Sequence, residues 1–326
     1  NRANCLAVLL ESICAQISPE HIARVEVVVF DNCSPDDTSE VVAGFVAACS
    51  CLKYVRNQTN IGADNNFVKA FTNARGKYLW ILGDDELLFD GAVDWVLKRC
   101  AGAEFGAAYL YSVPEILENV HSFLGQKVPS LVSVKSFSPW GFVRAANYRL
   151  TFLSGSVINR QAVLETNPCI EQEIEQYSGS NLVHLTWILS ASKSRHQSLI
   201  VTTPLLASTV ANSGGYSPVK VFVVNLSNLV AHYFSTENSR ARIFMQRFAL
   251  IGWFPKVIFD CRFSEKYRST GYKFSADEFP EELRSGLIWA LFDRGVLHGS
   301  KTSALLAMLG LKLIHKGLQA LYLHRA

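Results

Sequence analysis

The sequence predicts an α/β domain followed by a helical appendage. In the first 111 residues, short apolar segments alternate with segments of helical periodicity, which is typical of a mostly parallel sheet with crossover helices. After Pro218 the helical pattern continues almost without interruption. We therefore expect an α/β domain over residues 1–212 and a helical region over residues 213–326.

Strands and helices are expected in the following order. The expected strands are 25–30, 52–56, 78–82, 106–111, 131–135, 152–159 and 199–203. The expected helices are one after Asp37, then 66–74, 92–100, 182–192, 219–234, 238–252, 276–293 and 303–323. Because ligands of open α/β sheets gather at the carboxyl ends of strands, polar residues that follow strands are the first site candidates.

Composition excludes several classes of protein. With 49% hydrophobic and 18% charged residues, the 326-residue chain is not disordered and can bury a substantial apolar core. A net charge of +3 does not indicate nucleic acid binding. Eight cysteines form no Cys-x-x-Cys pair, and neither a secretory signal nor an apolar run of membrane-spanning length occurs. We therefore expect reduced thiols and a cytoplasmic location.

The first chemical signal is an apolar run that stops at Asp84, Asp85 and Glu86. Three adjacent carboxylates repel one another and raise one another's pKa unless a cation or solvent neutralises them. The segment therefore indicates a metal site at the end of a strand. The alternative is a solvated turn.

Two earlier turns carry the second signal. Asp31 follows an apolar strand and could accept from a base N–H or a ribose hydroxyl, although this turn could also serve only to cap the next helix. In the following turn, Gly62 allows a tight turn and Asn66 starts a helix. Backbone N–H groups at that helix start could face phosphate oxygens, and a plain connection is the alternative.

These three segments, in this order, resemble the family 2 glycosyltransferases, whose nucleotide-sugar domain has the GT-A fold. The likeness covers about the first 90 residues. The residues that fit the family's three elements are Asp31, Ser34, Asp36 and Thr38, then Asn60, Gly62 and Asn66, then Gly83, Asp84, Asp85 and Glu86.

The resemblance implies roles for these residues. It places the donor nucleotide on Asp31, Asn32, Ser34, Asn60, Gly62, Asn66 and Asp84. Asp84 and Glu86 would meet Mg²⁺ or Mn²⁺ bridging the diphosphate, and Asp85 would point toward the sugar. Glu86 stands where aspartate is commoner in the family, which leaves open whether it binds metal directly or through water.

The catalytic base is left open by the sequence. The Glu-Asp pair that commonly supplies it in the family is absent. A stretch containing Glu173, His184 and Trp187 resembles the branch that includes abequosyltransferases and related O-antigen sugar transferases. His184 could be the base, with Glu173 and Asp85 as the other candidates. A histidine on an apolar helix can also be purely structural.

The function implied by the resemblance is inverting, metal-dependent sugar transfer in bacterial surface polysaccharide synthesis. The donor would be a CDP-, dTDP- or UDP-sugar, and the acceptor a saccharide, expected to be lipid-linked. The alternative is a non-catalytic module that binds a nucleotide or a glycan. A dinucleotide-dependent oxidoreductase is disfavoured because no Gly-x-Gly-x-x-Gly follows a strand.

Both ends of the chain carry expectations. The family opens with a strand followed by Pro-Thr-Tyr-Asn-Arg, and this sequence starts at Asn1-Arg2, so we expect the first strand of the sheet to be missing. From Arg294 onward there is no acid. The last helix, with Lys312, His315 and Lys316 on one stripe, suits an anionic leaflet at the inner face of the membrane, or a solvated basic face.

Overall fold

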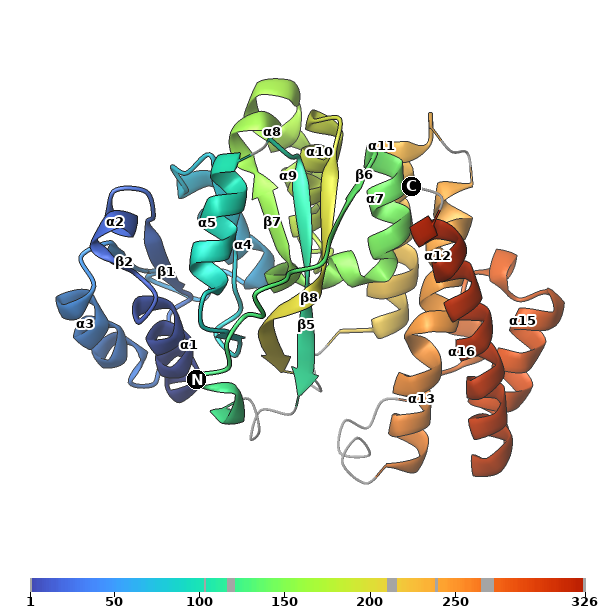
Figure 1. Ribbon diagram of the computed structural model, residues 1–326. Helices are drawn as coiled ribbons and strands as arrows, with labels where there is room; N and C mark the ends of the chain where they lie inside the picture. Colours follow the sequence, from blue (N-terminus) through green and yellow to red (C-terminus); the bar gives the residue numbers. More distant parts are fainter. Residues whose placement is uncertain are drawn as a thin grey trace. The chain divides into compact units, whose positions relative to one another are not determined.

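The computed structural model describes residues 2–102, 104–115, 121–209, 216–237, 240–264 and 273–324. The chain forms two compact units (Figure 1). The first contains residues 1–142 and 152–210, and the second contains residues 143–151 and 211–326.

The first unit alternates helices and strands. Its amino-terminal part contains α1 (Ala3–Cys14), α2 (Pro19–Ile22), β1 (Val27–Asp31), α3 (Thr38–Ala48), β2 (Leu52–Arg56), α4 (Ala63–Asn73), β3 (Tyr78–Trp80), β4 (Leu87–Leu88) and α5 (Ala92–Gly102). Next come β5 (Ala107–Glu115), η1 (His121–Phe123), β6 (Val134–Phe137), α7 (Pro139–Ala146), η2 (Asn147–Thr151), η3 (Leu153–Gly155), β7 (Ser156–Asn159), α8 (Arg160–Thr166), α9 (Ile170–Tyr177), α10 (His184–Ser194) and β8 (Ser198–Thr209). Helix α7 starts in the first unit and ends in the second, and η2 belongs to the second unit.

The strands of the described residues form two separate sheets. Strands β1 and β2 pair in parallel, and a six-stranded sheet has the order β3-β7-β5-β8-β4, with β6 also on β8. In the larger sheet the strands β5 and β8 pair in parallel, whereas the pairs β3–β7, β5–β7, β4–β8 and β6–β8 are antiparallel. The expected α/β class is confirmed, but the sheet is mixed rather than mostly parallel.

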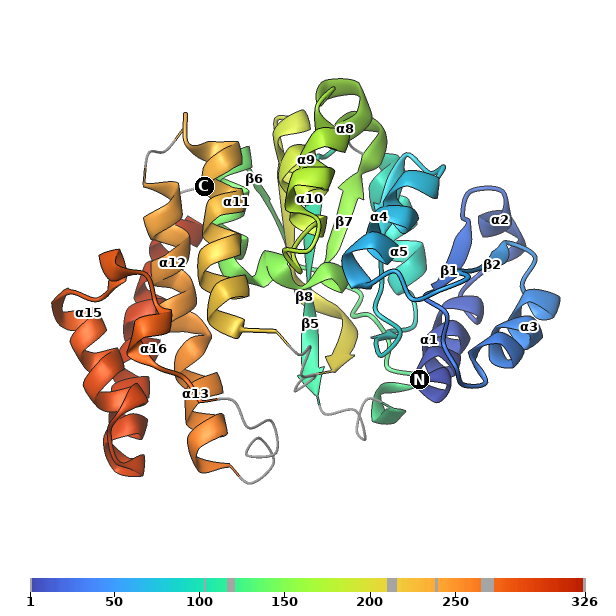
Figure 2. The ribbon, with the colours of Figure 1, turned by 180° about the vertical axis from the view of Figure 1, so that it is seen from behind.

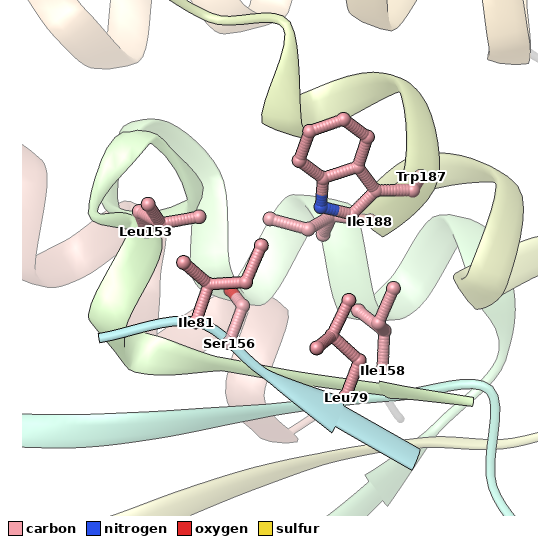
Figure 3. Close-up of a pocket in the computed structure, with 7 residues that line it drawn as sticks. All are labelled: Leu79, Ile81, Leu153, Ser156, Ile158, Trp187 and Ile188. Carbon is pink, nitrogen blue, oxygen red and sulfur yellow. The ribbon is translucent and has the colours of Figure 1, made fainter. Parts of the chain in front are cut away.

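Helix α10 is buried along most of its length. Gly106 lets the helix backbone approach the sheet, since a Cβ at this position would lie 2.0 Å from the Ala191 carbonyl oxygen. Trp187 is 1% exposed and stacks on Phe71 at a centroid distance of 4.7 Å. Figure 3 shows Trp187 and Ile188 facing side chains of β7 and of the β3 segment across a cavity of about 10 Å³. Trp187 is therefore a core residue.

The second unit is built from helices (Figure 2). They are η4 (Lys220–Asn225), α11 (Leu226–Phe234), α12 (Ala241–Gly252), α13 (Phe254–Phe263), η5 (Ala276–Glu278), η6 (Glu281–Leu283), α15 (Gly286–Leu291), η7 (Phe292–Leu297) and α16 (Lys301–His324). Its core contains a cluster of aromatic side chains, in which Phe279 packs against Phe254, Trp289 and Phe292. Within the described residues, no helix is long and apolar enough to span a membrane.

Helix α16 differs from its expected orientation. His315 is 7% exposed and packs against Tyr148 and Phe248, so it does not belong to an exposed basic stripe. Burial, and then the charge of Arg149, lower the pKa of His315 to about 4, which keeps the ring neutral at physiological pH. The buried stripe of α16 therefore includes His315, and leucines lie on its exposed side.

Candidate functional site

The turn after β1 is organised by Asp31, which is 4% exposed. One of its oxygens accepts from the Ser34 backbone N–H at 2.8 Å, and the other accepts from the Tyr54 hydroxyl at 2.6 Å. Arg56 Nε lies 3.6 Å from the second oxygen. Burial by itself raises the pKa of Asp31, but these hydrogen bonds and the Arg56 charge outweigh it and lower the pKa below its ordinary value. Asp31 is therefore an ionised acceptor.

Asn32 connects this turn to the start of α4. Its side-chain oxygen accepts from the Ile61 backbone N–H at 2.9 Å. Its amide nitrogen donates to the Asn60 side chain at 2.9 Å and to the Gly62 carbonyl at 3.2 Å. Gly62 has a φ of 84°, which an L side chain adopts only with strain. The two predicted turns therefore form one hydrogen-bonded platform.

Asn57, at the end of β2, extends the platform. Its amide donates to Asn32 at 3.1 Å and to Asn66 at 2.9 Å, and its oxygen accepts from Lys69 at 2.6 Å. Asn66 in turn donates to the Phe30 carbonyl at 3.0 Å. Asn57 is 6% exposed, so these bonds replace those it would otherwise make with water. The network fixes the α4 start against the ends of β1 and β2.

The acidic turn lies between β3 and β4 and is paired with Arg2. Arg2 Nε donates to Asp84 Oδ2 at 2.9 Å, and Arg2 Nη1 lies 3.0 Å from Asp85 Oδ2. Asp85 also accepts from the Thr209 hydroxyl. Burial raises the pKa of Asp84; Arg2 opposes this and Asp85 adds to it, and the net shift is upward. In this structure Arg2 supplies the charge that the acidic cluster requires.

The start of α1 holds the acidic turn close to the turn after β1. Directly after Arg2, the Ala3 backbone N–H donates to Asp36 at 3.0 Å. Asp36 also accepts from the Thr38 hydroxyl at 2.7 Å. The hydrogen bond from Thr38 has the largest effect on the pKa of Asp36; together with the Ala3 bond it outweighs desolvation and lowers this pKa to about 2. Consecutive residues of one helix start thus contact both turns.

Glu86 lies deeper than its two acidic neighbours and is 5% exposed. Its Oε1 accepts from the Ser154 hydroxyl at 3.1 Å, while Oε2 has no hydrogen-bond partner among the described residues. Ser154 also accepts from the Gly83 N–H at 2.9 Å. Burial, and then the charge of Asp85, raise the pKa of Glu86 to about 8. Glu86 is therefore protonated over much of the neutral range.

The acidic turn provides one carboxylate suited to bind a divalent cation directly. The Asp84 side chain is 34% exposed, whereas Glu86 is buried beside Ser154. Among the described residues, no group of three or more His, Cys, Asp or Glu side chains is arranged to hold a metal ion. A hard cation here would bind Asp84 and complete its coordination with water or phosphate oxygens.

A cavity of about 800 Å³ runs between β1 and β3. Its walls are the two strands and apolar side chains of α1, α4 and α5. In the described residues β1 pairs with β2 and β3 with β7, so the edges facing the cavity are unpaired. The polar residues that line it include Arg2, Asp31, Asn32, Ser34, Asn66 and Asp84. Five of the predicted donor-binding residues thus line one space.

The three candidate bases lie in different surroundings. His184 begins α10, is 3% exposed and meets the Phe67 ring edge-on at 6.4 Å. Glu173 accepts from Asn167 at 2.8 Å on α9. Neither residue lines the cavity. Asp85 is not a lining residue either, but it shares Arg2 with Asp84, and both Arg2 and Asp84 line the cavity.

Several residues of the site carry no local sequence signal. Tyr54, Asn57 and Ser154 each act through a contact with a distant segment, whereas Arg2 belongs to the Asn-Arg pair that the resemblance had already marked. The only available signal was positional, because Tyr54 and Asn57 fall at the end of a predicted strand.

The buried Glu86 makes stability depend on pH. Between pH 4.5 and about 8 the folded state holds a proton that the unfolded state has lost, so the free energy of unfolding falls as pH rises through this range. This decrease in the free energy of unfolding should amount to roughly 3–5 kcal/mol, and we expect Glu86→Gln to abolish it. Urea unfolding at pH 5, 6.5 and 8 without divalent cations measures it.

The matched control for this prediction is Glu171→Gln, because Glu171 is exposed on α9. It should keep the pH dependence of the unsubstituted protein. An equal pH dependence in the Glu86 variant and the unsubstituted protein would contradict the prediction.

Comparison with known sequences identifies relatives of the first part of the chain. Residues 1–126 match the model of glycosyl transferase family 2. The chain is 35% identical over 89 residues to abequosyltransferase RfbV of Salmonella typhimurium, which is 27% of this chain and 26% of that protein. It is 30% identical over 105 residues to the GalNAc(5)-diNAcBac-PP-undecaprenol beta-1,3-glucosyltransferase of Campylobacter jejuni, 32% and 33% of the two chains. The matches thus span a quarter to a third of these curated relatives.

Comparison with solved structures covers the larger part of the chain. A fragment of S. aureus TarS, residues 1–349, solved in complex with UDP-GlcNAc, superposes with a TM-score of 0.54 at 15% identity, over 96% of this chain and 88% of that one. The fragment in complex with UDP gives a TM-score of 0.52 at 16% identity, over 96% and 87%. At this identity the likeness shows the fold alone. Residues 1–126 therefore resemble glycosyl transferase family 2 in sequence, and the chain shares the fold of the TarS fragment.

Proposed function

We propose that this protein transfers a sugar from a nucleoside diphosphate to a saccharide acceptor. The observation that carries the proposal is the cavity at which Asp31, Asn32, Ser34, Asn66 and Asp84 meet. An ionised acceptor, an amide platform and an exposed carboxylate suit the base or ribose, the backbone and the diphosphate of one nucleotide.

Metal dependence is part of the proposal, with Mg²⁺ or Mn²⁺ held by Asp84. A divalent cation would stabilise the negative charge that develops on the departing nucleoside diphosphate. Arg2 now pairs with Asp84, and it would be available to the diphosphate when a cation takes that carboxylate. Glu86, buried behind Ser154, would support the turn or act through water.

For inverting transfer we propose Asp85 as the base. An inverting reaction needs a group that removes the proton of the acceptor hydroxyl as it attacks the anomeric carbon. Asp85 is adjacent to the proposed metal ligand Asp84 and shares Arg2 with it, whereas His184 packs against Phe67 and Glu173 bonds to Asn167. Arg2 and Thr209, which contact Asp85, would orient its carboxylate.

The acceptor class is proposed from a relative. The Campylobacter jejuni enzyme is named for an undecaprenol-linked saccharide. We propose a lipid-linked saccharide for this chain as well, in bacterial surface polysaccharide synthesis, and a cytoplasmic location on the inner face of the membrane. The donor's base and sugar stay open among CDP-, dTDP- and UDP-sugars.

A second candidate function is a module that binds nucleotide or glycan without catalysis. It is favoured by one observation, that Asp84 and Asp85 are both paired with Arg2 while both oxygens of Asp31 bond to protein groups. Turnover of a nucleotide-sugar donor distinguishes the transferase from the binding module.

A further proposal concerns the slot between β1 and β3. Two unpaired strand edges with apolar helices around them suit one more strand, since a strand inserted in a sheet lies about 4.8 Å from each neighbour. We propose that this slot accepts one more extended segment, paired with both strand edges.

The donor site is tested by calorimetric titration of CDP, UDP and dTDP in the presence of Mn²⁺. We expect one nucleotide to bind, and Asp84→Asn to weaken its binding by at least tenfold because the cation loses its charged ligand. The matched control is Asp94→Asn, on the exposed side of α5, which should bind as the unsubstituted protein does. Equal binding with and without Mn²⁺ would contradict the metal role.

Catalysis by Asp85 is tested by release of nucleoside diphosphate from the donor that binds. We expect Asp85→Asn to lower kcat by about 10²–10⁴, with nucleotide affinity nearly unchanged, because only the base is lost. Undiminished turnover in this variant would exclude Asp85. Nucleotide binding without any turnover by the unsubstituted protein would instead favour the binding module.

The strand slot is tested by adding five alternating valine and threonine residues ahead of residue 1. We expect a higher urea midpoint, by about 1 kcal/mol or more in the free energy of unfolding, and slower amide exchange in β1 and β3. A glycine–serine extension of equal length is the control. Identical midpoints for the two extensions would contradict the proposal.

A further inference from the structure

Helix α16 presents two contrasting faces. Ala304, Ala307, Leu311 and His315 are buried against the second unit. The opposite face is exposed to solvent. In Figure 1 α16 lies in front of other helices of this unit, and in Figure 2, seen from behind, these helices lie in front of α16. We name this exposed side the leucine–lysine face, made of Leu305, Leu306, Leu309, Lys312, Leu313 and Lys316.

The leucines of this face are unusually open to solvent. Leu306, Leu309 and Leu313 are 66%, 59% and 71% exposed. Their spacing of three and four residues puts them on successive turns of one helix side. A helix that buries one apolar stripe in its own core has no structural need for a second one, and contiguous exposed apolar patches mark interaction sites.

Positive charge accompanies the leucines. Lys301, Lys312 and Lys316 are exposed, and none of them forms an ion pair with a described residue. The second unit as a whole has 17 Lys and Arg against 8 Asp and Glu, while the first unit has 14 against 20. The modest net charge of the chain therefore hides a basic helical unit beside an acidic α/β unit.

We propose that the leucine–lysine face binds the surface of an anionic lipid bilayer. The helix would lie in the plane of the interface, with its leucines at the boundary of the acyl chains. The lysines would keep their aliphatic stems along the apolar layer and place their ammonium groups among lipid phosphates. Over its 24 residues α16 is about 36 Å long, enough to hold several turns on the surface.

Charge favours a bilayer over a second copy of the chain. A symmetric pair of these faces would bring lysines against lysines in a unit that is already strongly basic. An anionic lipid surface satisfies the leucines and the lysines together. The inference does not rest on the proposed sugar transfer, because none of these residues belongs to the donor site.

Co-sedimentation with vesicles tests the proposal. The full chain is mixed with vesicles of phosphatidylglycerol and phosphatidylcholine, or of phosphatidylcholine alone. We expect binding to the anionic vesicles that weakens with salt, and about fivefold weaker binding for each lysine replaced in Lys312→Gln and Lys316→Gln. The triple variant L306Q/L309Q/L313Q should lose binding.

A matched control replaces two exposed leucines of the first unit, L131Q/L164Q, which are 84% and 46% exposed. It should bind as the unsubstituted protein does, and circular dichroism should show an unchanged fold for both leucine variants. Absence of binding to anionic vesicles, or equal binding by the triple variant, would overturn the proposal. So would a dimer in sedimentation velocity that the triple variant abolishes, because the face would then bind a second copy.

Discussion

The candidate site depends on the start of α1, where Arg2 pairs with Asp84 and Asp85 and the next backbone N–H bonds to Asp36. These contacts join two turns that lie about fifty residues apart in the sequence and belong to different sheets. The β1–β2 pair and the larger sheet are not hydrogen-bonded to each other in the described residues. The start of α1 therefore connects the two sheets, a connection that backbone hydrogen bonds between strands would make in a continuous sheet.

Charge in the site is arranged so that each acid has a different state. Asp31 is kept ionised by donors that point at it, while Glu86 is kept protonated by burial. Burial raises the pKa of Asp84, and its carboxylate is paired with the Arg2 guanidinium. The proposed metal and diphosphate would need an exposed carboxylate whose present partner can leave, and a guanidinium is such a partner because it also binds phosphate.

The strand ends could be predicted from the sequence because an apolar run followed by polar residues has one common structural meaning. Asp31 and Asp84 were found in this way, and they line one cavity. The partners that hold them could not, since Tyr54 and Ser154 act across 23 and 68 residues. The antiparallel direction of β7 between β3 and β5 could not be predicted either, because hydrophobic periodicity does not encode strand direction.

Helix α16 shows a further limit of periodicity. Leucines and polar residues alternate around it, so the pattern alone could not decide which stripe faces the core. Packing decided it, since small residues such as Ala304 and Ala307 let the helix approach η7 closely, where Gly295 has no room for a Cβ beside Ala307. The larger leucines were left outside.

The most direct test is a crystal structure with Mn²⁺ and the nucleoside diphosphate that binds in solution. We expect the base or ribose at Asp31 and the cation on Asp84, with Arg2 released from that carboxylate. A nucleotide bound elsewhere, or an intact pair between Arg2 and Asp84 with the nucleotide in place, would contradict the donor site.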